Sequence, residues 1–285
     1  MSPFLPGLAA HPNAAGSAEG PLRRIALRLA YDGSAFHGWQ IQDHCESIEA
    51  ALAQALTTAV RRPTRVYGSG RTDAGVHALN QVAHCDIPEG IDLERLRASL
   101  NALAAPAISV QDIVPVPGDF HARHSAIGKV YRYHIQNRAY PAVLARERCW
   151  WIRLPLNIPA MREAAAALAG THDFSAFRAS QCAAPSPVRE MRRIELSEGD
   201  WSDGTLRVEL EASGFLQHMA RIIVGNLVSV GLGKLSPPGL AAILATRNRT
   251  RAAMTAPAKG LHLVQVFYDL AAFPQLRGWA GPAPR

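Results

Sequence analysis

A single carboxylate in a glycine-rich loop is the residue of this sequence best placed to do chemistry. The carboxylate is Asp73, and three glycines flank it within the stretch 68–84. Glycine lets a backbone adopt conformations that other residues avoid and lets a ligand approach closely. Arg71 stands two positions earlier, and a cation so near favours the ionised carboxylate. Such a carboxylate can act as a nucleophile or a base, or it can only brace its own turn.

A second charged residue stands out because its surroundings are apolar. Arg221 lies in the stretch 214–231, which contains a predicted helix that is apolar nearly all round. A guanidinium in such a helix is rarely buried without a partner, since an unpaired buried charge is strongly destabilising. Asp73 is the obvious anion to seek. The alternative is that Arg221 lies near the helix start and extends to solvent.

Other side chains suit contact with a nucleic acid. Tyr131 lies on one face of a strand predicted at 129–135. A base stacked on an aromatic ring gains about 1–3 kcal/mol, although a strand tyrosine is more often a core residue. The candidate phosphate contacts lie in two basic loops, which could equally be solvated surfaces, and they are His121, Arg123, Arg247 and Arg249.

The composition is that of a basic globular protein. The 285 residues carry 30 Lys and Arg against 23 Asp and Glu, a net charge of +7. Only three of the cations are lysines, and arginine suits bidentate contact with phosphate. The balance therefore favours nucleic acid as a partner. A GC-rich genome, which also replaces lysine by arginine, explains the same composition.

Several other classes of site lack their sequence signals. The chain has neither the GK[ST] of a P-loop nor a GxGxxG after a strand, so a nucleotide cofactor is not predicted. His77 and His84 lack a third ligand at suitable spacing, and the four cysteines form no CxxC. We therefore expect no metal and no cofactor. Scattered cysteines fit a reducing cytoplasm, and no stretch has the length and apolarity of a membrane span.

Periodicity predicts helices and strands mixed in both halves of the chain. We expect an α+β fold with two lobes that share or abut one sheet and a cleft between them. The predicted strands are 25–31, 64–67, 81–87, 108–116, 129–135, 188–196, 206–212 and 261–268. The predicted helices include one capped by Ser47, one at 92–104, one at 160–169 capped by Asn157, and one that starts at Pro237. We expect disorder at 1–20, lobes at 21–118 and 119–273, and a loose tail at 274–285.

Five segments, in order, resemble one family. GRTDAGVHALNQVAH (70–84) closely resembles the catalytic motif of the TruA family of tRNA pseudouridine synthases. The likeness extends over almost the whole chain after about residue 21. The other segments that carry it are YDGSAFHGWQ (31–40), FHARHSAIGKVYRY (120–133), GFLQHMARIIVG (214–225) and TAPAKGLHLVQV (255–266).

The resemblance implies isomerisation of uridine to pseudouridine at positions 38, 39 and 40 of the tRNA anticodon stem-loop. It implies that Asp73 is the nucleophile, that Tyr131 stacks on the flipped base, and that Arg71 displaces or holds the target nucleotide. It further implies that Arg221 pairs with Asp73 and that Leu263 packs under the tyrosine. For the fold, it implies two α+β lobes on a shared, mostly antiparallel sheet with a central basic cleft. Family members use no metal or organic cofactor and act as homodimers.

Two other functions were weighed against this one. The first is an RNA-binding or RNA-chaperoning protein whose basic cleft matters more than its aspartate. The second is a hydrolase that acts through Asp73 and His77, which would need a second acid/base group or a metal close by. The sequence gives no signal for either requirement.

Overall fold

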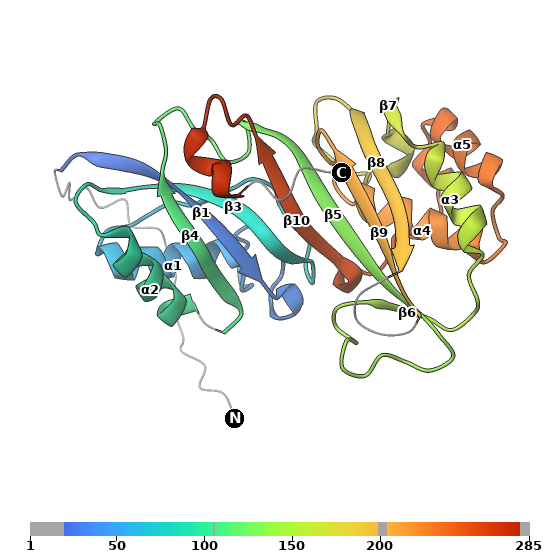
Figure 1. Cartoon of the computed structure of the whole chain (residues 1–285), viewed down its shortest axis with the longest axis horizontal. Helices are drawn as coiled ribbons and strands as arrows, with labels where there is room; N and C mark the ends of the chain where they lie inside the picture. Colours follow the sequence, from blue (N-terminus) through green and yellow to red (C-terminus); the bar gives the residue numbers. More distant parts are fainter. Residues whose placement is uncertain (1–19, 105, 199–203, 280–285) are drawn as a thin grey trace.

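One sheet of ten strands runs through both halves of the chain (Figure 1). The structure is a computed structural model, and it describes residues 20–104, 106–198 and 204–279. The strands are β1 (Leu22–Tyr31), β2 (Tyr67–Gly68), β3 (His77–Pro88), β4 (Ile108–Pro115), β5 (Ala126–Asn137), β6 (Trp150–Ile152), β7 (Gly170–Asp173), β8 (Val188–Glu198), β9 (Thr205–Ala212) and β10 (Leu261–Tyr268).

The strand order is β4-β1-β3-β10-β5-β9-β8-β7, with β2 beside β3 and β6 beside β5. Neighbouring strands pair antiparallel except β3 with β10 and β5 with β6. The predicted hairpin of 188–196 with 206–212 is confirmed as β8 and β9. The α+β fold on a mostly antiparallel sheet is therefore confirmed.

Two helices, α1 (Ile48–Val60) and α2 (Leu93–Ala104), accompany the strands of the first half, β1 to β4. The Ser47 side chain accepts a hydrogen bond from the backbone N–H of Ala50 and caps α1 as predicted. Leu52 and Leu56 recur at helical spacing and are fully buried. The burial of this apolar stripe fixes α1 in the core of the first half.

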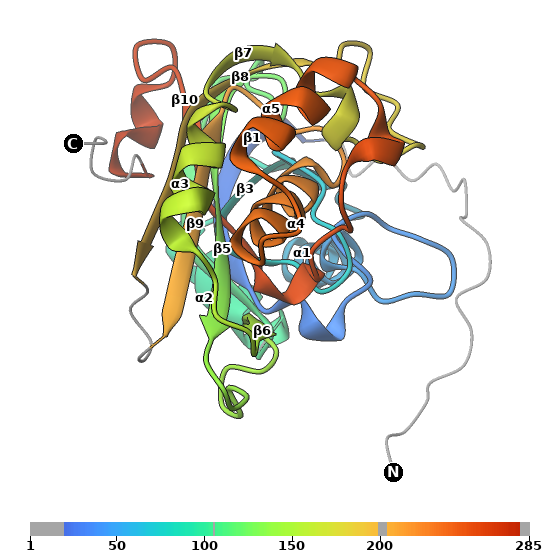
Figure 2. The same cartoon turned by 90° about the vertical axis from the view of Figure 1, so that its right-hand side faces the viewer.

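Three helices belong to the second half, which runs from β5 to β10: α3 (Ile158–Ala166), α4 (Met219–Gly231) and α5 (Pro237–Thr246). Asn157 caps α3 as predicted, because its side chain accepts from the N–H of Ala160. Nearly all of α4 is buried, in agreement with its apolar sequence. Figure 2 shows α1, α4 and α5 on one side of the sheet.

The two halves of the sheet meet where β3 pairs with β10, a junction that we call the seam. The pairing is parallel, and the residues in register are His262 with His77 and Leu263 with Ala78. β10 also pairs antiparallel with β5, so the last strand of the chain lies between the two halves. The division proposed at 118/119 falls in the connection from β4 to β5.

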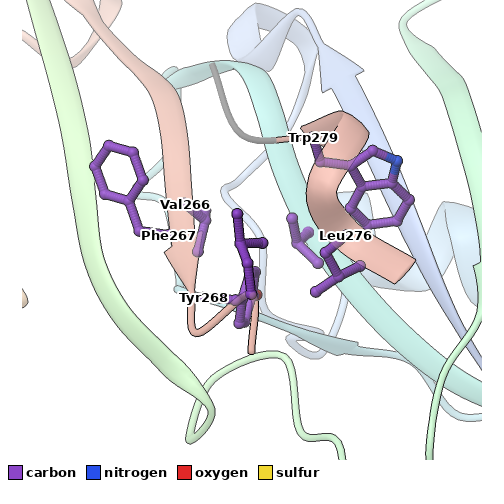
Figure 3. Close-up of a pocket in the computed structure, with 7 residues that line it drawn as sticks. Val266, Phe267, Tyr268, Leu276 and Trp279 are labelled. Atoms are coloured by element: carbon purple, nitrogen blue, oxygen red, sulfur yellow. The ribbon is translucent and has the colours of Figure 1, made fainter. Parts of the chain in front are cut away.

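The part of the C-terminal tail that the structure describes differs from the prediction. Residues 1–19 and 280–285 lie outside the described residues. Residues 274–279, predicted to be loose, instead form the 3₁₀ segment η5 (Pro274–Trp279), on the opposite side of the sheet from α4 (Figure 2). Leu276 and Trp279 are buried there beside a small apolar cavity of about 60 Å³ (Figure 3). The Trp279 indole N–H also donates to Asp112 (2.6 Å), so apolar burial and a hydrogen bond both fix this segment.

Candidate active site

The loop that carries Asp73 connects β2 to β3. β2 has two residues and is shorter than the strand predicted at 64–67. Gly75 has a φ of 77°, a left-handed conformation that favours glycine. The N–H of Val76 donates to the backbone carbonyl of Asp73 (3.1 Å). The backbone therefore closes this turn, and the carboxylate is left for other contacts.

A network of buried polar side chains fixes the start of this loop. The Thr72 hydroxyl lies 2.8 Å from the hydroxyl of Tyr31, and the Gln81 amide donates to the carbonyl of Gly70 (2.8 Å). The Ser69 hydroxyl donates to Oε1 of Gln81 (2.6 Å). Ser69 and Gln81 are fully buried, so these hydrogen bonds satisfy groups that water cannot reach. Burial also raises the pKa of Tyr31, which keeps its hydroxyl neutral.

The Asp73 carboxylate contacts the second half of the chain. Its Oδ2 lies 2.7 Å from Nη1 of Arg221, and Nε of Arg221 donates to the carbonyl of Ala256 (2.8 Å). The Arg221 side chain is only 16% exposed. The predicted contact between Asp73 and Arg221 is confirmed. Neither a carboxylate that braces only its own turn nor an arginine that extends to solvent describes this site.

His218 also faces the carboxylate, and the sequence analysis missed it. Its Nε2 lies 3.6 Å from Oδ2 of Asp73. His218 is the N-cap of α4, with a φ of 62° and no capping hydrogen bond from its side chain. A residue other than glycine held at positive φ is strained, and such strain is often found at functional sites. Its position three residues before Arg221 was the available sequence signal, because that spacing places both side chains at one helix end.

Tyr131 and Leu263 lie on neighbouring strands near this carboxylate. They are in register between β5 and β10, and Leu263 is fully buried. Only 7% of Tyr131 is exposed, and its ring packs at right angles against Phe215, with centroids 4.9 Å apart. Burial is the main reason that the pKa of Tyr131 is raised, and the charge of Asp73 contributes. The Tyr131 hydroxyl is therefore neutral.

Arg71, the cation predicted beside Asp73 from the sequence, differs from Arg221 in its exposure and its contacts. Arg71 is exposed, and the ion pair that Asp73 makes is with Arg221. Beneath the same loop lies Lys129, which the sequence analysis did not select although lysine is rare in this chain. Its ammonium donates to the carbonyl of Ser69 (2.7 Å), and burial lowers its pKa to about 8. Lys129 therefore supports the loop from below.

The four candidate phosphate contacts differ in exposure and in their partners. Arg123 is exposed, and His121 accepts from the backbone N–H groups of Arg123 and His124. Arg247 is exposed and lies 3.4 Å from Asp173. Arg249 instead donates to the carbonyls of 252 and 253 and to the hydroxyl of 255, so it holds the segment that leads to Ala256.

A cleft of about 460 Å³ opens beside His218. Among the described residues, none of the side chains that line it is acidic. They are Ala179, Ser180, Gln181, Gln217, His218, Ile222, Arg249 and Thr255.

The two histidines weighed as metal ligands have other contacts. Nδ1 of His77 accepts from the N–H of Gly33, and the His77 ring stacks on His262. Nδ1 of His84 accepts from the N–H of Ala122. Within the described ranges, no three His, Cys, Asp or Glu side chains form a group that could hold a metal ion. No helix in those ranges is long and apolar enough to cross a membrane.

Comparison with known proteins places these features in a family. Residues 164–269 match the family model of tRNA pseudouridine synthase. The chain is 42% identical over 248 residues to tRNA pseudouridine synthase A of Paramagnetospirillum magneticum, covering 86% of this chain and 95% of the relative. It is 44% identical over 246 residues to the protein of that name from Chromobacterium violaceum, covering 86% and 93%. The corresponding protein of Thermoanaerobacter sp. is 39% identical over 247 residues, with 87% and 100% covered. The chain therefore belongs to the tRNA pseudouridine synthase A family.

Proposed function

We propose that this protein isomerises uridine to pseudouridine at positions 38, 39 and 40 in the anticodon stem-loop of tRNA. The observation that carries the proposal is the Asp73 carboxylate, held 2.7 Å from Arg221 at the end of a glycine-rich loop. Membership of the family supports the reaction and the tRNA substrate.

One carboxylate is enough for this reaction. The bond from N1 of uracil to the ribose breaks, the base turns, and a bond forms from C5 to the same ribose carbon. A proton leaves C5 and N1 gains one, so atoms and electrons balance without a cofactor. Asp73 can attack the sugar, attack the uracil ring, or abstract a ribose proton on a glycal route. The base cannot turn inside a helix and must be flipped into the site.

The two carboxylate oxygens of Asp73 differ in their contacts. Oδ2 is paired with Arg221 and faced by His218. Among the described residues, Oδ1 has no hydrogen bond or ion pair. We therefore assign Oδ1 as the reacting oxygen, because Oδ2 is occupied by groups that fix the carboxylate and balance its charge.

The aromatic residue of the site has to meet the flipped base. Tyr131 stacks on it, with Leu263 beside the tyrosine on β10. Because Tyr131 is only 7% exposed, a neighbour must move to admit the base, and Phe215 is the ring in contact. Arg71 is exposed and free of Asp73, which suits a role in displacing or holding the target nucleotide.

The rest of the tRNA follows the basic surface around the site. His121, Arg123 and Arg247 are proposed to contact the RNA directly. Arg249, the fourth candidate, is proposed to support RNA binding by holding the segment 252–255. We further propose that the protein acts as a homodimer in the cytoplasm, with one tRNA touching both subunits. Sedimentation of the purified protein with and without tRNA tests this arrangement, and a monomer that is fully active would contradict it.

The reaction is tested by incubating purified protein with unmodified tRNA, without added metal or cofactor. Pseudouridine is mapped by carbodiimide labelling and primer extension, with Asp73→Asn in parallel. Wild-type protein should modify positions 38–40, whereas Asp73→Asn should bind tRNA and yield no product. Binding without product from either protein would instead favour an RNA-binding or chaperone function.

A further inference from the structure

We infer that the cleft beside His218 receives the base of a nucleotide that adjoins the target uridine. The inference rests on the proposed function and extends it, because it names a second binding site on the same RNA. The cleft has about 460 Å³, within the usual range of small-molecule sites, roughly 300–1,000 Å³.

The position of the cleft separates its occupant from the target base. His218 forms part of its wall and lies 3.6 Å from Oδ2 of Asp73, so the cleft begins at the edge of the reaction centre. Tyr131 and Leu263, which are proposed to meet the target base, are not among the lining residues. The occupant is therefore a different group. A nucleotide joined to the target by one phosphodiester is the part of the substrate that must lie nearby.

The chemistry of the lining favours a base over a phosphate. Gln181 and Gln217 are exposed, and neither amide has a hydrogen-bond partner among the described residues. The N–H of Ala179 donates to the backbone carbonyl of Gln217 (2.9 Å), which holds the two segments together. Each amide offers two donor hydrogens and an acceptor oxygen, which match the edge of a base. A phosphate is held most strongly by charge-assisted hydrogen bonds from cations, and one arginine, Arg249, is in the lining.

The only arginine of this lining is already engaged. Arg249 donates to the carbonyls of Ala252 and Ala253 and to the hydroxyl of Thr255, at 3.1–3.3 Å. Its guanidinium therefore shapes the wall of the cleft, and the exposed amides of Gln181 and Gln217 carry no charge. A glutamine side chain can turn over to present either its donors or its acceptor. Binding in the cleft should therefore need a base to be present, but any of the four bases should be accepted.

The test uses tRNA transcripts that carry one target uridine and an abasic nucleotide on its 5′ or its 3′ side. For wild-type protein, one of these two substrates should raise KM about tenfold, the effect of losing about two hydrogen bonds, with little change in kcat. A tRNA that carries any of the other three bases at that position, in place of the original base, should change KM far less.

The protein variant is the double substitution Gln181→Ala with Gln217→Ala. Its matched control is Gln275→Ala, an exposed residue of η5 on the opposite side of the sheet.

The double variant should show a raised KM on intact tRNA and no additional rise on the abasic substrate. A wild-type KM for the double variant on intact tRNA would overturn the inference. The inference would also be overturned if the abasic substrate raised KM by the same factor for wild type and for the double variant, because the glutamines would then act elsewhere. If wild-type protein formed no pseudouridine in any tRNA, the proposed function itself would fail, and the inference with it.

Discussion

The loop on the first half of the chain and helix α4 on the second half make different kinds of contact around Asp73. The loop is held by neutral, buried hydrogen bonds from residues of its own half, such as Gln81 and Tyr31. These contacts reach the backbone and the residues before Asp73, not its carboxylate. Helix α4 instead presents charged or titratable side chains, Arg221 and His218, directly to Oδ2.

This difference separates the placement of the carboxylate from the balance of its charge. A neutral network suits placement, since fully paired buried hydrogen bonds make a backbone rigid and their strength is little affected by salt. A cation at the end of an apolar helix suits charge balance, because Nε of Arg221 is fixed by the carbonyl of Ala256 while Nη1 meets Oδ2 of Asp73. Substitutions on the two sides should therefore have different kinetic signatures.

The largest effect is expected on the helix side. Arg221→Met removes the cation but keeps an apolar stem, and it should lower kcat by roughly 10²–10³, as when a single electrostatic contact to a reacting group is lost. KM for tRNA should change little, because Arg221 is 16% exposed and points to Asp73. Single-turnover rates measured beside Arg95→Met, an exposed arginine of α2, provide the comparison. A loss confined to tRNA affinity would contradict the assigned role.

A smaller effect, mainly on stability, is expected on the loop side. Gln81→Leu leaves the Ser69 hydroxyl and the Gly70 carbonyl without their partner, which should lower the free energy of unfolding by about 1–3 kcal/mol. The loop should also lose its fixed position, so kcat should fall less than for Arg221→Met. Gln111→Leu, on an exposed residue of β4, is the control for urea unfolding and should stay near wild type. If Gln81→Leu and Gln111→Leu had the same free energy of unfolding, the hydrogen bonds of Gln81 would not be what holds the loop.

How far the sequence could predict this site depends on the range of each interaction. The cap of α1 by Ser47 and the apolar burial of α4 follow from local pattern, because capping and periodicity involve residues a few positions apart. The contact of Asp73 with Arg221 spans 148 positions, and it was predictable because a buried cation demands an anion. These predictions required only the general rules of helix formation and charge pairing.

The features that were missed depend on how distant segments pack. Gln81 is the first residue of the strand predicted at 81–87, and nothing local indicates that its amide joins Ser69 to Gly70. The burial of Trp279 was missed because a short segment rich in Pro and Gly has no periodicity, while its stability comes from Asp112 and the opposite face of the sheet. Such contacts appear only once the sheet order is known.

The seam between the halves provides the smallest prediction, one that appears only in acid. His262 lies there against His77 and His134, and burial, with the charges of these histidines and of Arg132, lowers its pKa to about 3. Its ordinary value is 6.5, so below that pH the unfolded chain binds a proton that the folded chain refuses, and stability falls as the pH decreases from 6.5 towards 3.

His262→Phe keeps a ring on His77 and removes this titration. Between pH 7 and pH 4.5 the variant should therefore lose roughly 1–2 kcal/mol less stability than wild type in urea unfolding. His37→Phe, on an exposed histidine, should keep the wild-type slope. Identical slopes for wild type and His262→Phe would mean that protonation at the seam does not contribute to acid unfolding. The parallel pairing of β3 with β10 would then hold the two halves together in acid without a contribution from His262.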